Sequence, residues 1–299
     1  MGEVEKKYEL TSDAIELEFI GKKLFRIKAL RDFADVKAGD LGGYIEKEEN
    51  LSQYEDCWIY EEAKAYEDAR VYEDAEVFGN ACVSGDAHVS GNAVVSGDAR
   101  VYGYASVYGY ADVSENAHVS GDVTVHENAT VCGHADVNGD AHVYGYASVY
   151  GYASVYGDAT VSGNVVVEGN AKISDHANVR GHAEVSGDAH VSGHALVSGN
   201  AVVSGNAQMS DHAVVDDDAL VTENALVCED ANISGHAIVS GRARVYGHAT
   251  VDGTAKVDGD TVVDGKMHLN GSNQEGEEAA TQEQQNEAVP AVKRKPRGR

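Results

Sequence analysis

The sequence has few of the residues that usually build a globular core. Among its 299 residues there are 2 prolines, 1 tryptophan and 4 phenylalanines, which excludes a conventional core of large aromatic rings. No apolar run approaches the ~18 residues of a membrane span. The first segment, MGEVEKKYEL, lacks the apolar stretch of a secretory signal. We therefore expect a soluble cytoplasmic protein with no membrane partner.

Cysteine is also scarce. The spacings of the four cysteines match neither a CxxC metal site nor a small disulfide framework. The four are Cys57, Cys82, Cys132 and Cys228. We predict free thiols, which fits a reducing compartment.

Positive charge is outnumbered throughout most of the chain. The sequence has 23 Lys and Arg against 50 Asp and Glu, a formal net charge of -27. Residues 57–269 alone carry 31 acids and 9 bases, a net charge of -22. A surface of this sign repels nucleic acid and anionic membranes, and it attracts basic proteins or cations. We therefore expect a protein partner with a basic surface, and no direct binding of nucleic acid by this region.

The abundant feature is a six-residue repeat. From Ile59 to Leu269 every sixth residue is aliphatic or small, which gives 36 positions, 30 of them valine. The residue two places earlier is nearly always alanine from Ala63 to Ala255. A helix cannot use a period of six, whereas alternation within each repeat fits a short strand with valine and alanine on one side.

Each repeat ends in a corner. Its first corner position is glycine or an acid, as at Gly91 and Glu115, and its second is commonly Asn, Asp or His. Because acids replace glycine there, we expect that a positive φ is not required. Strands and corners without long connections build a coil. This pattern is typical of the single-stranded left-handed parallel β-helix, an all-β fold in which three repeats close one 18-residue coil. Twelve coils would form a rod about 58 Å long at ~4.8 Å per coil.

The 18-residue coil predicts columns of side chains. One second-corner column contains no asparagine, whereas the other two do, as expected for three chemically different edges. Its central members are Asp122, Asp140, Asp158, His176, His194 and His212. Stacked imidazoles of His176, His194 and His212 are candidate ligands of an adventitious divalent metal. The aspartates are candidates for binding a basic partner, and the alternative is that each side chain satisfies its own corner.

Tyrosine is the one common aromatic residue, with 16 copies, of which eight lie in two runs of VYGYASVYGYA. The runs start seven repeats apart, which is not a whole number of coils, so equivalent tyrosines should lie on different faces. Large outward rings on a rigid surface suit partner contact. The candidates are Tyr102, Tyr108, Tyr144, Tyr150 and Tyr156.

The ends differ from the repeat. Residues 1–56 are expected to form a small β cap, because an open solenoid end exposes a sheet edge. Gly39, Gly42 and Gly43 suggest turns in it, and Trp58 is expected to cover the first layer of the β-helix at 57–269. Residues 270–299 are polar and are expected to be a disordered tail with a basic C-terminus.

The junction carries a family resemblance. The segments VKAGDLGGYI, NLSQ and DCWIYEEA, followed at once by the repeats, resemble the YdcK-type family of bacterial and phage hexapeptide-repeat proteins. The resemblance covers roughly residues 20–75. It implies the β-helix and the cap, and it implies a transferase or acyltransferase activity by analogy with other left-handed β-helix enzymes. No catalytic residue carries over from it.

Two functions stay open. The first is a non-enzymatic, rigid acidic rod that binds a protein or acts as a spacer and needs no cofactor. In its most specific form this rod is of phage origin and acts as a DNA mimic. The alternative is an acyltransferase that uses acyl-CoA and a histidine base at the groove of a homotrimer. The register runs from 59 to 269 without an inserted loop, which leaves little to build a substrate pocket, so we favour the rod.

Overall fold

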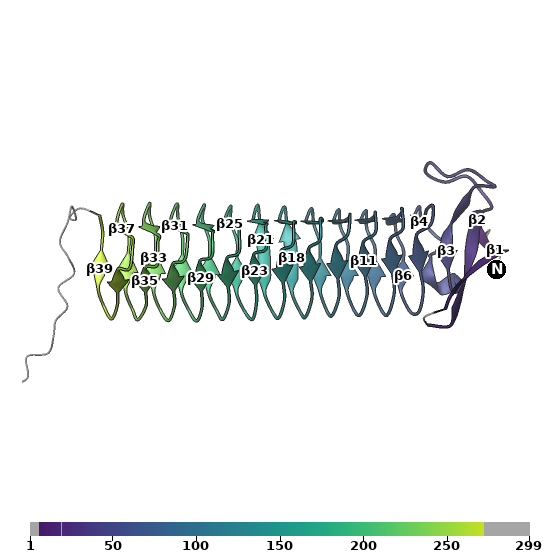
Figure 1. The fold of residues 1–299 in the computed structure, drawn as a ribbon. Coiled ribbons are helices and arrows are strands. Elements are labelled where there is room, and N and C mark those ends of the chain that lie inside the picture. The colour runs from purple at the N-terminus through teal and green to yellow at the C-terminus, as the bar shows by residue number, and fades with distance from the viewer. Residues whose placement is uncertain (1–5, 19, 272–299) are drawn as a thin grey trace, which may run out of the picture.

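The protein is a long three-sided prism closed at one end by a β cap (Figure 1). The computed structural model describes residues 6–18 and 20–271. The prism is an all-β parallel solenoid with the 18-residue coil that the repeat predicts. The left-handed sense of the coil stays a prediction. Most of the expected tail, from residue 272 onward, lies outside the described residues.

The repeating unit is a two-residue strand that recurs with every repeat. It begins with β4 (Trp58–Ile59) and ends with β39 (His268–Leu269). Two of these strands, β18 (His142–Gly145) and β21 (Thr160–Gly163), are longer. Parallel pairing joins equivalent positions of successive coils, such as Val95 and Val113, and the 18-residue coil is therefore confirmed.

The strands form three flat faces. Each face is named here after its first solenoid strand: the β4 face runs from β4 to β37 (Lys256–Val257), the β5 face from β5 (Lys64–Ala65) to β38 (Val262–Val263), and the β6 face from β6 (Arg70–Val71) to β39. Each face holds 12 solenoid strands, and the β5 face is extended by three cap strands. The three faces meet at three edges made of the corner residues.

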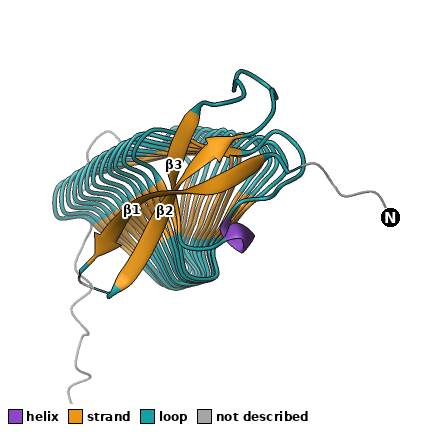
Figure 2. Cartoon of the chain, turned by 90° about the vertical axis from the view of Figure 1, so that its right-hand side faces the viewer, coloured by secondary structure: helices purple, strands orange, loops and turns teal. Residues whose placement is uncertain are grey.

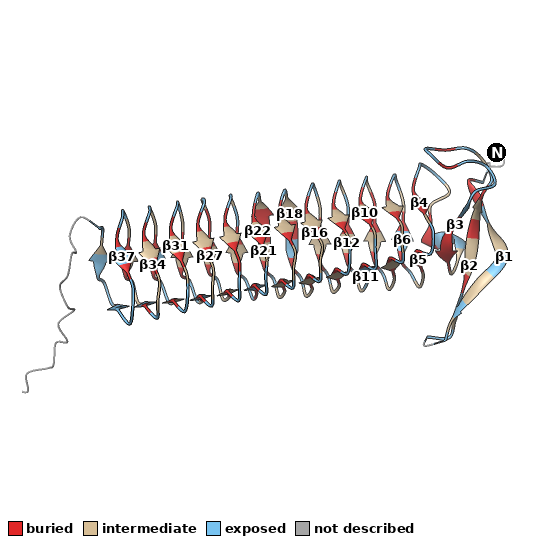
Figure 3. Ribbon diagram, turned by 45° about the horizontal axis from the view of Figure 1, so that its top comes forward, coloured by how far each residue is buried: buried red, intermediate tan, exposed pale blue. Residues whose placement is uncertain are grey.

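The core is a column of valine layers flanked by alanine. Every inward valine from Val71 to Val251 is fully buried, and the alanines beside them are at most 1 % exposed (Figure 3). Alternation sends the intervening residues outward. Burial of apolar surface stabilises the fold by ~25 cal/mol per Å². A single coil would leave its valine layer exposed on both sides, so each coil needs its neighbours for this stabilisation. All outward chemistry therefore depends on an unbroken stack.

The structure contradicts the expectation that the first corner position does not require a positive φ. All ten acids at the first corner position have positive φ, between 53° and 62°, just as the corner glycines do. The corner does require the left-handed region. The acids are Glu61, Glu67, Glu73, Glu115, Glu127, Asp175, Asp211, Asp217, Glu223 and Glu229. This conformation is unfavourable for a residue with a Cβ, so something must offset its cost.

A hydrogen bond to the next coil provides that compensation. In eight of the ten cases the carboxylate accepts the corner N–H of the equivalent residue one coil later. The Glu223 carboxylate, for example, accepts from Gly241 at 2.8 Å. Acids at these corners are therefore structural links between coils as well as surface charges.

The cap is a β-hairpin followed by one irregular turn. The hairpin strands β1 (Tyr8–Leu17) and β2 (Lys22–Ala29) pair antiparallel and cross the end of the prism (Figure 2). Then β3 (Leu41–Ile45) pairs in parallel with β5, with Tyr44 opposite Lys64, and the 3-10 helix η1 (Glu48–Asn50) follows β3 in the chain. This pairing makes the turn that begins with β3 slightly longer than a regular coil.

The glycines of the cap have two different roles. Gly39 has a φ of 99° and occupies a turn, as expected. Gly42 and Gly43 lie within β3, so their prediction as turn residues was wrong. A Cβ on Gly42 would lie 2.6 Å from the Ile59 carbonyl oxygen. Glycine is present there because the backbones approach closely.

Aromatic rings and one buried lysine seal the end of the prism. Trp58 is 1 % exposed and packs edge-to-face against Phe33 at 5.3 Å and Tyr8 at 6.1 Å. Lys7 is fully buried, and its Nζ donates to the carbonyl oxygens of Tyr54, Glu55 and Cys57. Because burial disfavours the charged form, it lowers the pKa of Lys7 despite these acceptors. Trp58 covers the first layer as the sequence predicts.

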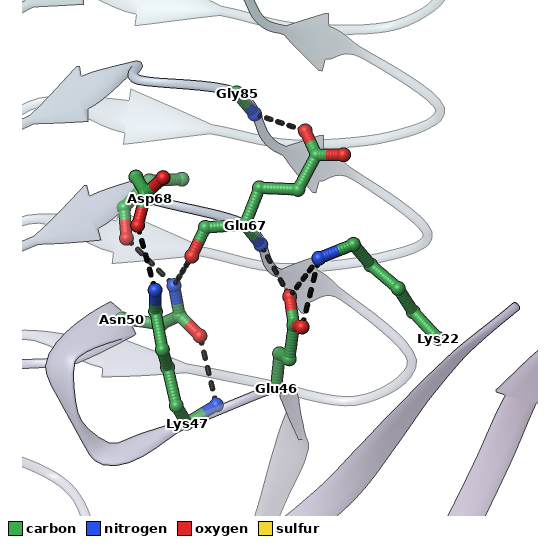
Figure 4. A network of polar contacts seen from close by, with 8 residues as sticks. Lys22, Glu46, Lys47, Asn50, Glu67, Asp68 and Gly85 are labelled. Carbon is green, nitrogen blue, oxygen red and sulfur yellow. Dashed lines mark hydrogen bonds and ion pairs between the residues drawn. The ribbon is translucent and has the colours of Figure 1, made fainter. Parts of the chain in front are cut away.

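A polar network joins the cap to the first coils (Figure 4). The Glu46 carboxylate accepts from Lys22 Nζ at 2.8 and 2.9 Å and from the Glu67 N–H at 2.7 Å. Asn50 Nδ2 donates to the carbonyl oxygens of Glu67 and Ala69. Burial alone would raise the pKa of Glu46, but the hydrogen bonds from Lys22 and Glu67 lower it overall.

Replacing a corner acid with alanine should destabilise the protein more than replacing it with glycine. Glu223→Ala keeps the positive φ and loses the bond to Gly241, so it should destabilise the protein by about 1 kcal/mol. Glu223→Gly loses the same bond but relieves the backbone, so its cost should be only a few tenths of a kcal/mol. Chemical denaturation of both variants measures the difference, and equal losses would contradict the compensation.

The Glu46 network should make the cap junction sensitive to acid. A carboxyl whose folded pKa lies below its unfolded value stabilises the fold above the unfolded pKa, and this stability is lost as the pH falls through the folded pKa. Glu46→Gln should therefore cost about 0.5–1 kcal/mol at pH 7 and progressively less below the ordinary pKa of glutamate. Denaturation from pH 7 to pH 3 provides the measurement; a cost independent of pH would count against this prediction.

Candidate functional sites on the edges and faces

The edge between the β5 and β6 faces carries the predicted column of acids and histidines. We call it the aspartate–histidine edge, defined by six exposed residues on successive coils. They are Asp122, Asp140, Asp158, His176, His194 and His212. The parallel pairing of the flanking strands holds these residues one coil apart, ~4.8 Å in the direction of the axis. The stacking that the sequence predicts is therefore confirmed.

The three imidazoles are stacked face to face. The ring centroids of His176 and His194 lie 4.7 Å apart with an angle of 5° between the planes, and those of His194 and His212 lie 5.1 Å apart at 8°. His176 Nδ1 also lies 3.0 Å from Asp158 Oδ2, which links the two halves of the edge. The rings contact one another through their faces and leave their nitrogen atoms at the rim.

This stacking bears directly on the metal hypothesis. A tetrahedral ion requires nitrogen lone pairs that converge on one point, whereas parallel rings direct theirs side by side. Within residues 6–18 and 20–271, no group of three or more His, Cys, Asp or Glu side chains has an arrangement that could hold a metal ion. The three aspartates of the edge belong to this same described region, so they form no such group either.

The five predicted tyrosines are distributed over all three faces. Tyr102 and Tyr156 follow strands of the β5 face, Tyr108 and Tyr144 belong to the β6 face, and Tyr150 follows a strand of the β4 face. A hydrogen bond to the Glu168 carboxylate, with a smaller effect of burial, raises the pKa of Tyr150 to about 12. The structure does not gather the five rings into one platform.

A ring stack on the β6 face was missed by the sequence reasoning. Tyr108, His126 and Tyr144 stack with centroids 4.8 and 5.0 Å apart and planes within 8°. Burial lowers the pKa of His126, which favours the neutral imidazole between the two phenol rings. The signal was present in the sequence, because these residues are spaced by exactly one coil. Comparison of the two tyrosine runs with each other concealed it.

The most exposed tyrosines are at the corners. Their exposed fractions are 64–67 %, compared with 40 % for Tyr102 and 39 % for Tyr108. They are Tyr104, Tyr110, Tyr146 and Tyr152. Tyr152 stacks on His134 at 4.8 Å. Corner tyrosines are therefore better placed to reach a partner than the face tyrosines named from the sequence.

The four cysteine thiols are not activated as nucleophiles. Burial raises the pKa of all four cysteine thiols, which favours the protonated form. The strand register is unbroken from β4 to β39, and no inserted loop folds over a face of the solenoid there. Between β4 and β39, therefore, no inserted loop builds a substrate chamber on the solenoid.

Comparison with known families supports the repeat assignment. Residues 153–169, 189–205 and 195–211 match the family model described as YdcK Beta solenoid repeat. These segments therefore resemble YdcK-type solenoid repeats. They lie in the middle of the prism, well beyond the cap junction that carries the resemblance noted above. A search of curated proteins finds no match to this chain. No helix within residues 6–18 and 20–271 is long and apolar enough to cross a membrane.

We expect Zn²⁺ to bind the histidine stack of the solenoid only weakly. Parallel imidazoles should yield dissociation constants weaker than about 10 µM, because at most one or two nitrogens of the stack reach one ion. Isothermal titration of the protein and of His194→Ala tests this. Tight one-to-one binding that His194→Ala abolishes would establish the metal site and refute the geometric argument.

Proposed function

We propose that this YdcK-type solenoid is a rigid, non-enzymatic acidic module that binds a protein with a basic surface along the aspartate–histidine edge. The observation that carries the proposal is the alignment of exposed carboxylates by an uninterrupted register. Asp122, Asp140 and Asp158 stand on consecutive coils of one edge. Within the described residues, the side chains of Asp122 and Asp140 have no ion-pair partner.

The charge of the whole edge supports the proposal. Counting both corner positions, this edge carries ten acids over the solenoid, more than either of the other two edges. Rows of like charge steer an oppositely charged partner and give specificity through their spacing. The prism supplies the stiffness that keeps this spacing fixed.

DNA mimicry is the most specific form of the proposal. A net charge of -22 over residues 57–269 corresponds to about one negative charge per 2.6 Å of a rod of ~58 Å. Duplex DNA carries one per ~1.7 Å. The densities are of the same order, so a nucleic-acid-binding surface is a partner of the right chemistry. The phage origin implied by the family resemblance is part of this hypothesis.

An acyltransferase with a histidine base at a trimer groove is the alternative function. It predicts turnover of acetyl-CoA by the purified protein and loss of turnover in a single His→Ala variant. Such turnover would replace the binding proposal.

The proposal is tested by binding of a basic partner to edge variants. The partner is recovered from a lysate at low salt, identified, purified and titrated into the protein by calorimetry. The triple variant Asp122→Asn, Asp140→Asn, Asp158→Asn should weaken binding about tenfold, at ~0.5 kcal/mol per exposed charge. The dissociation constant should rise with salt concentration.

A matched control removes the same charge from the other edges. The variant Asp98→Asn, Asp188→Asn, Asp218→Asn alters three exposed second-corner aspartates away from the aspartate–histidine edge. It should leave the affinity within about twofold of the wild type. Equal losses in the two triple variants would show attraction by net charge alone and would overturn the assignment to this edge.

A further inference from the structure

A cleft lies where the cap hairpin overhangs the β5 face. It has a volume of about 690 Å³. Figure 3 shows the hairpin β1–β2 projecting beyond the prism on the side where β5 and β11 (Arg100–Val101) are labelled. Leu17 and Ile20 reach the cleft from the hairpin end, and Ile20 is 46 % exposed. The floor of the cleft is the outer surface of the first coils.

Two adjacent columns of the β5 face create the hollow. One column runs Lys64, Cys82, Arg100 at paired strand positions. Beside it, the residues that follow each of these strands run Tyr66, Ser84, Tyr102. In both columns a small side chain lies between two large ones on neighbouring coils, ~4.8 Å away on either side. The coil of Cys82 and Ser84 is therefore recessed.

The charge of the cleft is opposite to that of the rest of the molecule. Its lining contains Lys64, Arg100 and His118 and no carboxylate, in a chain with 50 acids and 23 bases. Lys64 Nζ donates to the Glu62 carbonyl oxygen at 2.7 Å. The exposed Arg100 side chain makes no ion pair among the described residues. On the following coil, Asp136 pairs with the position of His118, so the column of basic residues ends there, outside the cleft.

The thiol in the cleft does not cancel this charge. Burial raises the pKa of Cys82, although Lys64 and Arg100 both act to lower it. The neutral thiol therefore adds no negative charge to the lining of the recess, and the nearby Asp98 carboxylate also acts to raise the thiol pKa. A guanidinium without a partner can bind a carboxylate or phosphate through two parallel hydrogen bonds.

We propose that this cleft binds a small aromatic anion, whose carboxylate or phosphate pairs with Arg100 and Lys64 while its ring packs among Tyr66, Tyr102 and Ile20. The volume falls in the range of small-molecule sites, which combine apolar walls with a few polar groups. The site is separate from the aspartate–histidine edge and needs no basic partner. Carboxylate and phosphate share the chemistry that the cleft recognises, and the choice of probe separates them.

The test uses defined probes on the full-length protein. Indole-3-acetate, phenyl phosphate and adenosine 5′-monophosphate are titrated up to 10 mM in separate experiments, followed by chemical shifts of labelled tyrosines, with adenosine and benzyl alcohol as neutral controls. We expect at least one anionic probe to bind and to shift Tyr66 or Tyr102, and the neutral controls to bind at least tenfold more weakly. Indole-3-acetate represents the carboxylates, whereas the other two represent phosphates.

Three variants locate the binding. Arg100→Gln should weaken it at least tenfold. Ser84→Tyr should abolish it by filling the recess, in a column that already accepts Tyr66 and Tyr102. Arg244→Gln is the matched control, because Arg244 occupies the equivalent exposed position eight coils further along the β5 face. This variant should bind the anionic probe as the wild type does. Circular dichroism and thermal unfolding verify that each variant is folded.

Three outcomes would overturn the proposal that the cleft binds a small aromatic anion. Failure of all three anionic probes to bind at 10 mM, equal binding of the neutral controls, or binding unchanged in folded Arg100→Gln and Ser84→Tyr each refutes it. These outcomes leave the edge proposal untouched, since the edge is tested with a protein partner and different variants.

Discussion

The structure depends on the burial of one inward column of valine and alanine side chains. From Val71 to Val251 every valine layer is covered by the layers before and after it, so each coil is stable only within the stack. A single inserted or deleted residue would reverse which side chains point inward from that position onward. This constraint explains the monotony of the sequence and restricts all variation to the outward positions.

Outward side chains form columns along the prism, because every coil has the same length of three repeats and residues 18 apart lie above one another. Residues that are far apart in the sequence become neighbours, and identical or compatible neighbours stack. The His176–His194–His212 and Tyr108–His126–Tyr144 stacks arise in this way. The same rule produces the link from Glu223 to Gly241, in which an acid stabilises the following corner. Charge on this molecule is thus arranged by the repeat itself.

Much of this arrangement follows from the sequence. The period of six predicts strands and corners, and the chemical difference between the three corner columns predicts a coil of three repeats. The left-handed backbone of Glu223 was not predicted, because the exchange of glycine for an acid suggests a relaxed requirement. The sequence does not reveal that such an acid can gain a hydrogen bond one coil later. The cleft was not predicted either, because it depends on where the hairpin end at Leu17 and Ile20 lies relative to the β5 face.

The acidic surface and the cationic cleft act over different distances. In the proposed function, the edge carboxylates attract a large basic partner through a field that salt screens within ~8 Å at physiological ionic strength. In the proposed cleft complex, by contrast, a small anion contacts Arg100 directly. That proposal requires direct pairing with the guanidinium to outweigh the long-range repulsion from a chain of net charge -27. The two proposals are compatible on one rigid scaffold, because the summed field of many charges governs attraction of a basic protein along the edge, whereas direct contact governs binding of an anion on the face.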